Sequence, residues 1–174
     1  ALTSTLNVVE RRAPDRGEPP MGAQDAMLPQ LHERVMAGLG RGGEQGQALL
    51  EKYMAMEKAF YDAGGFLVVG TDPTGGGDVV PGYANQRALQ LLVEMGLTVE
   101  QAVEVATLNG ARYLERDSEI GTVEVGKRAD LVLIRGDPTA DVAAFRNTTL
   151  VFKDGVGFDS AKLFDSVEGW VGVR

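Results

Sequence analysis

Hydrophobic residues recur every three or four positions through much of the first two thirds of the chain. This spacing is typical of helices that bury one face. Gly96 is expected to end the helix before it, and Asn109-Gly110 is expected to break the next helix. Thr98 and Gln101 have the spacing of a capping box, so a new helix is expected after Thr98. The pattern predicts helices over residues 27–39, 47–63, 84–95 and 99–108, with a further turn over 111–114.

Short apolar runs rich in β-branched residues predict strands. The pair Asp154-Gly155 between two such runs is a strong signal for a hairpin with a two-residue turn. The last stretch, residues 160–174, has a weak pattern and is expected to pack as a tail. The predicted strands cover residues 1–9, 66–69, 120–123 and 129–134, and the two arms of the hairpin cover 149–153 and 156–158.

The strand over residues 66–69 ends abruptly in a glycine-rich loop over residues 70–77. In barrels and open sheets built from βα units, chemistry takes place at the carboxyl ends of the strands. Asp72 stands at such an end and is the first candidate catalytic residue. Because Asp, Pro and Gly each favour turns, the stretch read alone is explained equally well as a turn.

Composition narrows the classes of partner. Of the 174 residues, 44% are hydrophobic, which is normal for a chain that buries a core. Acidic residues outnumber basic ones by 25 to 17 without a basic stripe, so no nucleic acid partner is expected. No apolar run is long enough to span a bilayer and the start lacks a signal-peptide pattern, so no membrane partner is expected. The chain has no cysteine, which excludes thiolate metal sites.

Four segments follow one another in a recognisable order: Gly70-Thr71-Asp72-Pro73, then residues 94–98, 106–111 and 120–133. Together they resemble the carboxy-terminal part of the amidohydrolase superfamily. The likeness is greatest to the branch of imidazolonepropionase-like enzymes and metal-dependent dipeptidases. It runs from about residue 49 to 155, and the run from Gly126 to Leu131 is its most specific motif.

The resemblance implies an α/β fold: the carboxy-terminal portion of a (β/α)8 metal-dependent hydrolase barrel plus part of a small β-sandwich. Residues 1–118 would supply the last strands and helices of the barrel. Residues 119–159 would be the carboxy-terminal share of the sandwich, and residues 160–174 would be a tail.

The resemblance also implies a role for Asp72, as a ligand of a divalent metal and as the group that takes the proton from the attacking water. One or two ions are expected, with zinc as the expected metal. Thr74, Gly75 and Gly76 would shape the substrate pocket. Asp78 in the same loop would contact an ammonium or guanidinium group, or would simply be solvated.

The family's other metal ligands are histidines, and this chain has one, His32, inside a predicted helix rather than at a strand end. We do not expect it to be a ligand. A catalytic zinc needs about three protein ligands, so the resemblance implies that most of them lie outside this chain. The expected partner is the amino-terminal part of the same enzyme, as a separate or cleaved chain; the lack of an initial Met favours cleavage. The isolated chain is predicted to be inactive, and a homo-oligomer is compatible with the sequence.

The leading hypothesis is therefore part of a metal-dependent hydrolase that cleaves a small-molecule amide, peptide-like or N-acyl, with metal-activated water. Two alternatives remain open. One is a non-catalytic scaffold or interaction module derived from the same fold, for which Asp72 would be dispensable. The other is a hydrolase of a cyclic amide or a lactone, because the residues that recognise the substrate would come largely from outside this chain.

Overall fold

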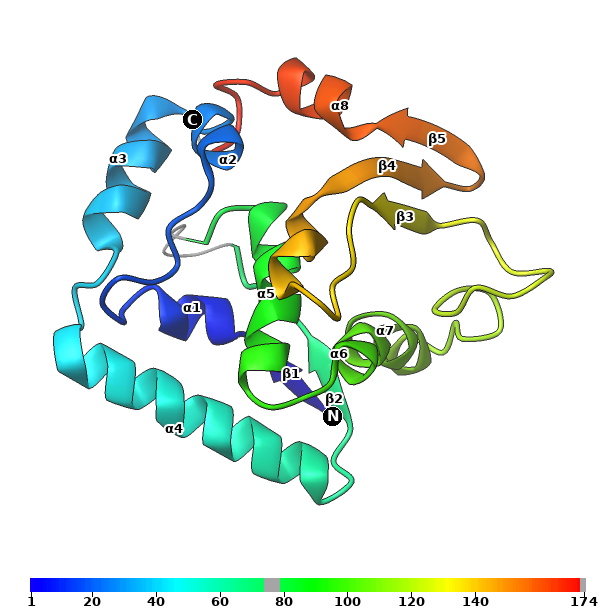
Figure 1. Ribbon diagram of the computed structural model, residues 1–174, viewed down its shortest axis with the longest axis horizontal. Helices are drawn as coiled ribbons and strands as arrows, with labels where there is room; N and C mark the ends of the chain where they lie inside the picture. The colour runs from blue at the N-terminus through cyan, green and yellow to red at the C-terminus, as the bar shows by residue number, and fades with distance from the viewer. Residues whose placement is uncertain (74–78, 173–174) are drawn as a thin grey trace.

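The structure is a computed structural model that describes residues 1–73 and 79–172. It contains two small sheets. The first is a parallel pair, β1 (Leu2–Ser4) and β2 (Leu67–Val69). The second is antiparallel and has the order β3 (Leu131–Ile134), β4 (Thr148–Lys153), β5 (Val156–Asp159). Helices surround the first sheet, and the second extends to one side of them (Figure 1). The predicted α/β class is confirmed.

Most of the helices lie either between β1 and β2 or between β2 and β3 (Figure 1). Between β1 and β2 lie α1 (Leu6–Glu10), α2 (Met21–Asp25), α3 (Pro29–Gly38) and α4 (Gly43–Asp62). After β2 come α5 (Tyr83–Glu94), α6 (Val99–Ala106) and α7 (Leu108–Tyr113). A 3₁₀ helix, η1 (Val142–Arg146), precedes β4, and α8 (Ser160–Ser166) follows β5.

The parallel pair is the centre of the main hydrophobic core. Leu67 is fully buried, and residues from α1, α4, α5 and α6 pack with it. A parallel pair needs cover on both faces, which explains why the β2 sequence is a continuous apolar run rather than an alternating one. The buried members of this core are Leu6, Ala13, Leu50, Leu67, Leu91, Leu92, Met95, Leu97, Ala102 and Val105.

Two local predictions are confirmed in atomic detail. Gln101 donates its backbone N–H to Thr98 Oγ1 over 3.2 Å, and Thr98 donates its own to Gln101 Oε1 over 2.9 Å, which completes the capping box of α6. In the hairpin, Lys153 pairs with Val156 across Asp154-Gly155. Both turn residues have positive φ, as a turn of this length requires.

The predicted strand over residues 1–9 is wrong beyond Ser4, because residues 6–10 form α1. Leu6 and Glu10 are one helical turn apart, and both are buried. Asn7 is also buried and donates from Nδ2 to the carbonyl of Ala84 over 3.1 Å. These contacts with distant parts of the chain override the β preference of the two valines in the segment.

Two further predictions are wrong. The helix break falls at Thr107, and Asn109-Gly110 lies inside α7. Residues 120–123 are not a strand: Ile120 donates its N–H to the carbonyl of Arg116 over 3.0 Å, and Gly121 has a φ of +97°. The hydrogen bond of Ile120 to a residue four positions earlier belongs to a turn. The positive φ of Gly121 lies outside the β region, where strand residues have negative φ.

The segment after β5 contains the unpredicted helix α8. Beyond that helix, Val171 forms a parallel bridge to Met27. Within residues 1–73 and 79–172 no helix is both long and apolar enough to cross a membrane.

Candidate functional site

The carboxyl ends of β1 and β2 meet at one edge of the sheet, because the strands are parallel and in register from Leu2↔Leu67 to Ser4↔Val69. The pairing continues one residue further, where Gly70 donates its N–H to the carbonyl of Ser4 over 2.8 Å. A Cβ on Gly70 would lie 2.6 Å from the Thr3 methyl carbon. A larger residue at this position would therefore require the Thr3 side chain to move.

Asp72 follows two residues later, with its side chain exposed. Its φ is +45°, which is uncommon for a residue other than glycine and is best tolerated by Asn and Asp. The structure thus places Asp72 beyond the carboxyl end of β2, as the sequence predicted. Thr74, Gly75, Gly76 and Asp78 lie outside the described residues.

His32 lies on α3 and is half-buried, at the edge of the packed face. Its Nε2 is 3.1 Å from Oε1 of Gln24, so an amide on the preceding helix orients the ring. Throughout residues 1–73 and 79–172, no three side chains of His, Cys, Asp or Glu are grouped as metal ligands would be. Asp72 therefore belongs to no such group within the described part of the chain.

A buried acid lies next to the end of β1. Glu57 on α4 is only 4% exposed, and its carboxyl hydrogen-bonds with the Ser4 side chain. Burial raises the pKa of Glu57, and the Ser4 hydrogen bond offsets part of that rise. Its Oε2 has no hydrogen-bond partner among the described residues. The sequence held a signal for this residue, because Glu57 falls in the helical spacing of Leu50, Met54 and Tyr61.

Four charged residues join the segment after β1 to α5. Glu10 is 1% exposed, and Arg87 donates to it from Nε over 3.0 Å and from Nη2 over 2.5 Å. Arg87 Nη2 also lies 2.8 Å from Glu94 Oε1, and Arg16 pairs with both acids. Burial acts to lower the pKa of Arg87, but the hydrogen bonds and charges of Glu10 and Glu94 raise it on balance. Sequence analysis missed this cluster, because 77 residues separate Glu10 from Arg87.

The motif over residues 126–131 forms hydrogen bonds within the second sheet. The Asp130 carboxylate accepts a hydrogen bond from the backbone N–H of Asp154 over 2.8 Å and one from Lys153 Nζ over 2.7 Å. These bonds hold the pKa of Asp130 below its usual range. Arg128 donates to the Asp154 side chain, also over 2.8 Å. The motif therefore ties the start of β3 to the hairpin turn between β4 and β5.

The sequence matches the model of a known family. The model of the amidohydrolase family matches residues 26–157, well over half of the chain. The chain belongs to the amidohydrolase family. The family predicted from the sequence is thus confirmed, and the chain belongs to a hydrolase family.

Curated relatives of this amidohydrolase chain share its segments at moderate identity. A 5-methylthioadenosine/S-adenosylhomocysteine deaminase from Moorella thermoacetica is 39% identical over 88 residues, 47% of this chain and 20% of the relative. An imidazolonepropionase from Bacteroides fragilis is 38% identical over 95 residues, 52% of this chain and 21% of the relative. The chain therefore spans about a fifth of the length of these relatives.

Solved structures agree with the family. The bottromycin amidohydrolase has a TM-score of 0.71 at 22% identity, covering 95% of this chain and 38% of that one. Phenylurea hydrolase B has a TM-score of 0.56 at 27% identity, covering 78% of this chain and 32% of that one. A Xaa-Pro dipeptidase has a TM-score of 0.56 at 21% identity, covering 79% and 33%. The likeness to the first and third shows a shared fold.

Proposed function

We propose that this chain is the carboxy-terminal part of a metal-dependent amidohydrolase that cleaves a peptide-like or N-acyl amide bond with water. The observation that carries the proposal is the position of Asp72, exposed beyond the carboxyl end of β2, in a chain of the amidohydrolase family. Reactions on sheets of parallel strands take place at that end.

Asp72 would act through its carboxylate oxygens. One would ligate a divalent metal, expected to be zinc, and the carboxylate would accept the proton of the water that attacks the amide carbon. A bound divalent ion supplies a water that ionises near neutral pH. Thr74, Gly75 and Gly76 are proposed to face the substrate.

The residues of this chain fit such an ion only in part. A carboxylate oxygen suits zinc, but about three protein ligands are needed, and the described residues group no such set. The proposal therefore places the remaining ligands on another segment: histidines and, for a two-ion site, a bridging group. That segment is the amino-terminal part of the enzyme, as a separate or cleaved chain.

Exposed apolar side chains support the proposal that a further segment covers the second sheet. Val132 and Leu133, neighbours on β3, point to opposite faces and are 61% and 48% exposed. Phe158 on β5 is also exposed. A sheet with apolar residues open on both faces is expected to be covered by further chain. We propose that residues 119–159 are half of a β-sandwich and that residues 1–118 close a (β/α)8 barrel, both with the amino-terminal part.

The test compares this chain alone with the chain joined by the amino-terminal part encoded by the same gene. Zinc content by plasma mass spectrometry and hydrolysis of a panel of dipeptides and N-acyl amino acids are measured for both. Metal and activity are expected only in the joined form. Asp72→Asn is expected to lower hydrolysis by a factor of about 100 or more, since it removes a proton acceptor.

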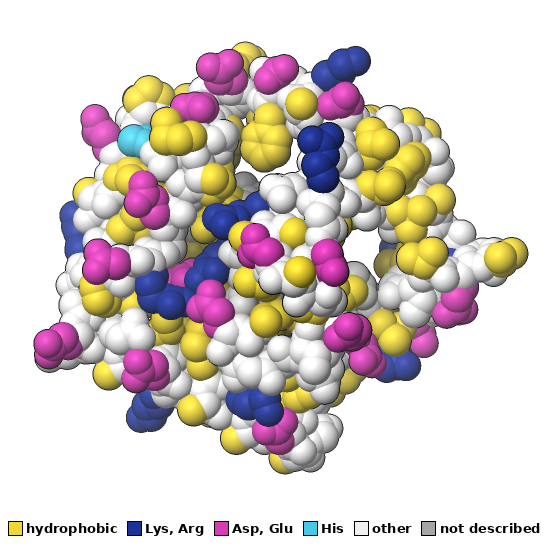
Figure 2. Space-filling view, viewed as in Figure 1, with side chains coloured by type: hydrophobic (Ala, Val, Ile, Leu, Met, Phe, Trp, Pro, Cys, Tyr) yellow, Lys and Arg dark blue, Asp and Glu magenta, His cyan; other side chains and the backbone are white. Residues whose placement is uncertain are grey.

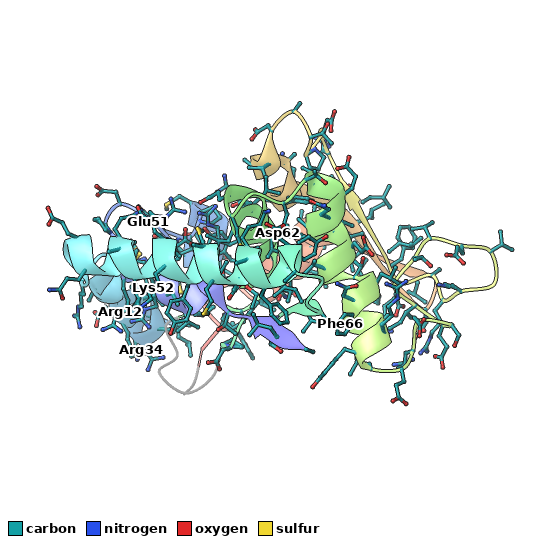
Figure 3. All side chains as sticks on the ribbon, turned by 90° about the horizontal axis from the view of Figure 1, so that it is seen from below. Arg12, Arg34, Glu51, Lys52, Asp62 and Phe66 are labelled. Atoms are coloured by element: carbon teal, nitrogen blue, oxygen red, sulfur yellow. The ribbon has the colours of Figure 1, made fainter. Side chains whose placement is uncertain are left out.

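Asp62→Asn is the matched control. Asp62 ends α4, and Figure 3 shows it on that helix, with Phe66 nearby where the chain leads into β2. It therefore lies at the amino end of β2, opposite to Asp72, and pairs with Lys58 over 2.7 Å. Activity in the isolated chain would contradict the need for a partner. Equal activity of the Asp72→Asn enzyme and the wild type would favour a non-catalytic role for this residue.

A further inference from the structure

A cavity of about 240 Å³, open to solvent on one side, lies between α2, α8 and the segment that leads into α5. In the space-filling view, hydrophobic side chains border a hollow among these three elements (Figure 2). The lining residues include Ala23, Ala26, Val80, Tyr83, Phe164 and Val167. None of them carries a charge. The polar atom at the tip of Tyr83 has its own partner, because the hydroxyl donates to the carbonyl of Glu18 over 3.2 Å.

The wall formed by the end of the chain is held in place by backbone hydrogen bonds. Gly169 donates to the carbonyl of Asp25 over 3.0 Å, and Val171 donates to that of Ala26 over 2.8 Å. Val171 in turn accepts from Leu28 over 2.8 Å. The segment after α8 is thus fixed to α2 on both sides of Ala26. The cavity is bounded by a fixed wall rather than by a loose tail.

The size and chemistry of the cavity define what it can hold. An apolar cavity of about 150 Å³ is large enough to bind benzene. A volume of 240 Å³ accommodates one ring with a few further carbon atoms, or a branched alkyl group. A lining without charge disfavours an ionised group, because burying an unpaired charge is costly.

The cavity is lined by residues of the two connections that follow β1 and β2. Val80 and Tyr83 belong to the connection that leaves the carboxyl end of β2 and enters α5. Ala23 and Ala26 belong to the segment that leaves the carboxyl end of β1. Figure 1 shows α2, α8 and the first turn of α5 gathered at one end of the molecule.

We propose that this cavity is a binding site for an aromatic or branched aliphatic group, and that the group belongs to the amide substrate. The assignment of this group to the amide substrate rests on the proposed hydrolase function. It narrows the substrate to an amide with a bulky apolar substituent, held by a wall that includes α8.

The first experiment measures binding without catalysis. Benzene is titrated into the 174-residue chain, and methyl resonances of Val80 and Val167 are followed by NMR. Both are expected to shift with saturation. Ala23→Phe, which fills the cavity, is expected to abolish the shifts, and Val132→Phe, on exposed β3, is expected to leave them unchanged. Absence of saturable shifts in the wild type, or equal loss in both variants, would overturn the site.

A second variant guards against misfolding of Ala23→Phe. Phe164→Ala removes a half-exposed ring from the wall and enlarges the cavity. It is expected to weaken benzene binding and to strengthen naphthalene binding. The same ligand preference in Phe164→Ala and the wild type would count against the site.

The second experiment uses the joined enzyme and two amides that differ only in acyl group, N-phenylacetyl and N-acetyl. The phenylacetyl substrate is expected to have kcat/KM larger by about tenfold or more, a common scale for one apolar group. Ala23→Phe is expected to remove that preference, and Met56→Phe, at an exposed position of α4, to keep it. Hydrolysis of both amides without preference would overturn the substrate assignment. Hydrolysis of neither, with benzene still bound, would overturn the proposed function and leave the apolar site standing.

Discussion

Asn109 donates a hydrogen bond from its side-chain Nδ2 to the backbone carbonyl of Leu67, over 2.9 Å and across 42 residues of sequence. Leu67 lies in β2, where the neighbours Phe66 and Val68 have the carbonyls that face β1. The Leu67 carbonyl therefore points away from β1, and Asn109 supplies the donor that no strand provides there among the described residues. An amide of α7 thus stabilises the strand that ends before Asp72.

Asn109→Leu is expected to destabilise the protein by about 1–3 kcal/mol, because the buried Leu67 carbonyl would lose its partner. Gly110→Ala is the matched control. A Cβ on Gly110 has no atom within 4 Å, and alanine is the better helix former, so a gain of about 0.5–1 kcal/mol is expected. Urea unfolding followed by circular dichroism measures both. Equal stability of the Asn109→Leu protein and the wild type would show that the bond does not support β2.

Arg87→Met is expected to destabilise the protein by about 3 kcal/mol, since it removes the main partner of a buried carboxylate. The loss should be at the low end of the range for buried pairs, because Arg16 Nη2 stays 3.1 Å from Glu10. Arg128→Met breaks an exposed pair with Asp154 and should cost about 1 kcal/mol or less.

The double variant Glu10→Leu with Arg87→Met tests the cause. It leaves no unpaired charge on α1, so it is expected to recover part of the loss in urea unfolding. If the double variant were less stable than Arg87→Met, the loss in the single variant would not come from the unpaired charge of Glu10.

Glu57 is expected to make the protein less stable as the pH rises. In the unfolded chain its carboxyl ionises near its ordinary pKa of about 4.3, whereas burial raises the pKa in the folded protein. The favourable contribution of neutral Glu57 is therefore complete below about pH 4 and is lost as the pH rises through the raised value. Glu57→Gln stays neutral, so the variant should gain stability over the wild type as the pH rises.

The measurement is the difference in unfolding free energy between Glu57→Gln and the wild type, from about pH 4 to about pH 8. A rise of about 1 kcal/mol is expected, on the scale of one poorly satisfied buried acceptor. Glu51→Gln is the control, because Glu51 is exposed on the same helix (Figure 3). A difference that stays constant with pH would mean that Glu57 ionises alike in both states.

Features that depend on neighbouring residues could be predicted from the sequence. The capping box of α6 and the hairpin turn at Asp154-Gly155 are such features. The conformation of residues 6–10 could not be, because Asn7 is held by the carbonyl of Ala84, and local preference pointed to a strand. Asn109 misled for a similar reason: an amide that favours turns is used here for a contact with β2.

Some residues of the candidate site could likewise be found from local sequence pattern, and others could not. Asp72 could be found because a strand followed by a glycine-rich loop marks a strand end, and the structure places it there. The pair of Glu10 and Arg87 joins residues too far apart for any local pattern to reveal. Glu57 could have been found, since a carboxylate at an apolar position of a helix indicates a buried acid.

Gly46 marks the point where α4 crosses the backbone of the segment after α1. A Cβ there would lie 2.1 Å from the carbonyl oxygen of Arg12 and 2.5 Å from its carbon. Gly46→Ala is therefore expected to destabilise by at least about 1–3 kcal/mol, even though alanine favours helices, because backbone cannot yield as a side chain can.

Gly22→Ala in α2 is the comparison, as a Cβ at Gly22 meets nothing within 4 Å. It should be neutral or slightly stabilising in the same urea unfolding experiment. The Gly46→Ala protein should also lose protection from hydrogen exchange at the amide of Gly42, which donates to Arg12 over 2.9 Å. If both substitutions were neutral and that amide stayed protected, α4 would have room to shift. The close crossing of α4 over Arg12 would then not be what fixes the helix against the β1–β2 core.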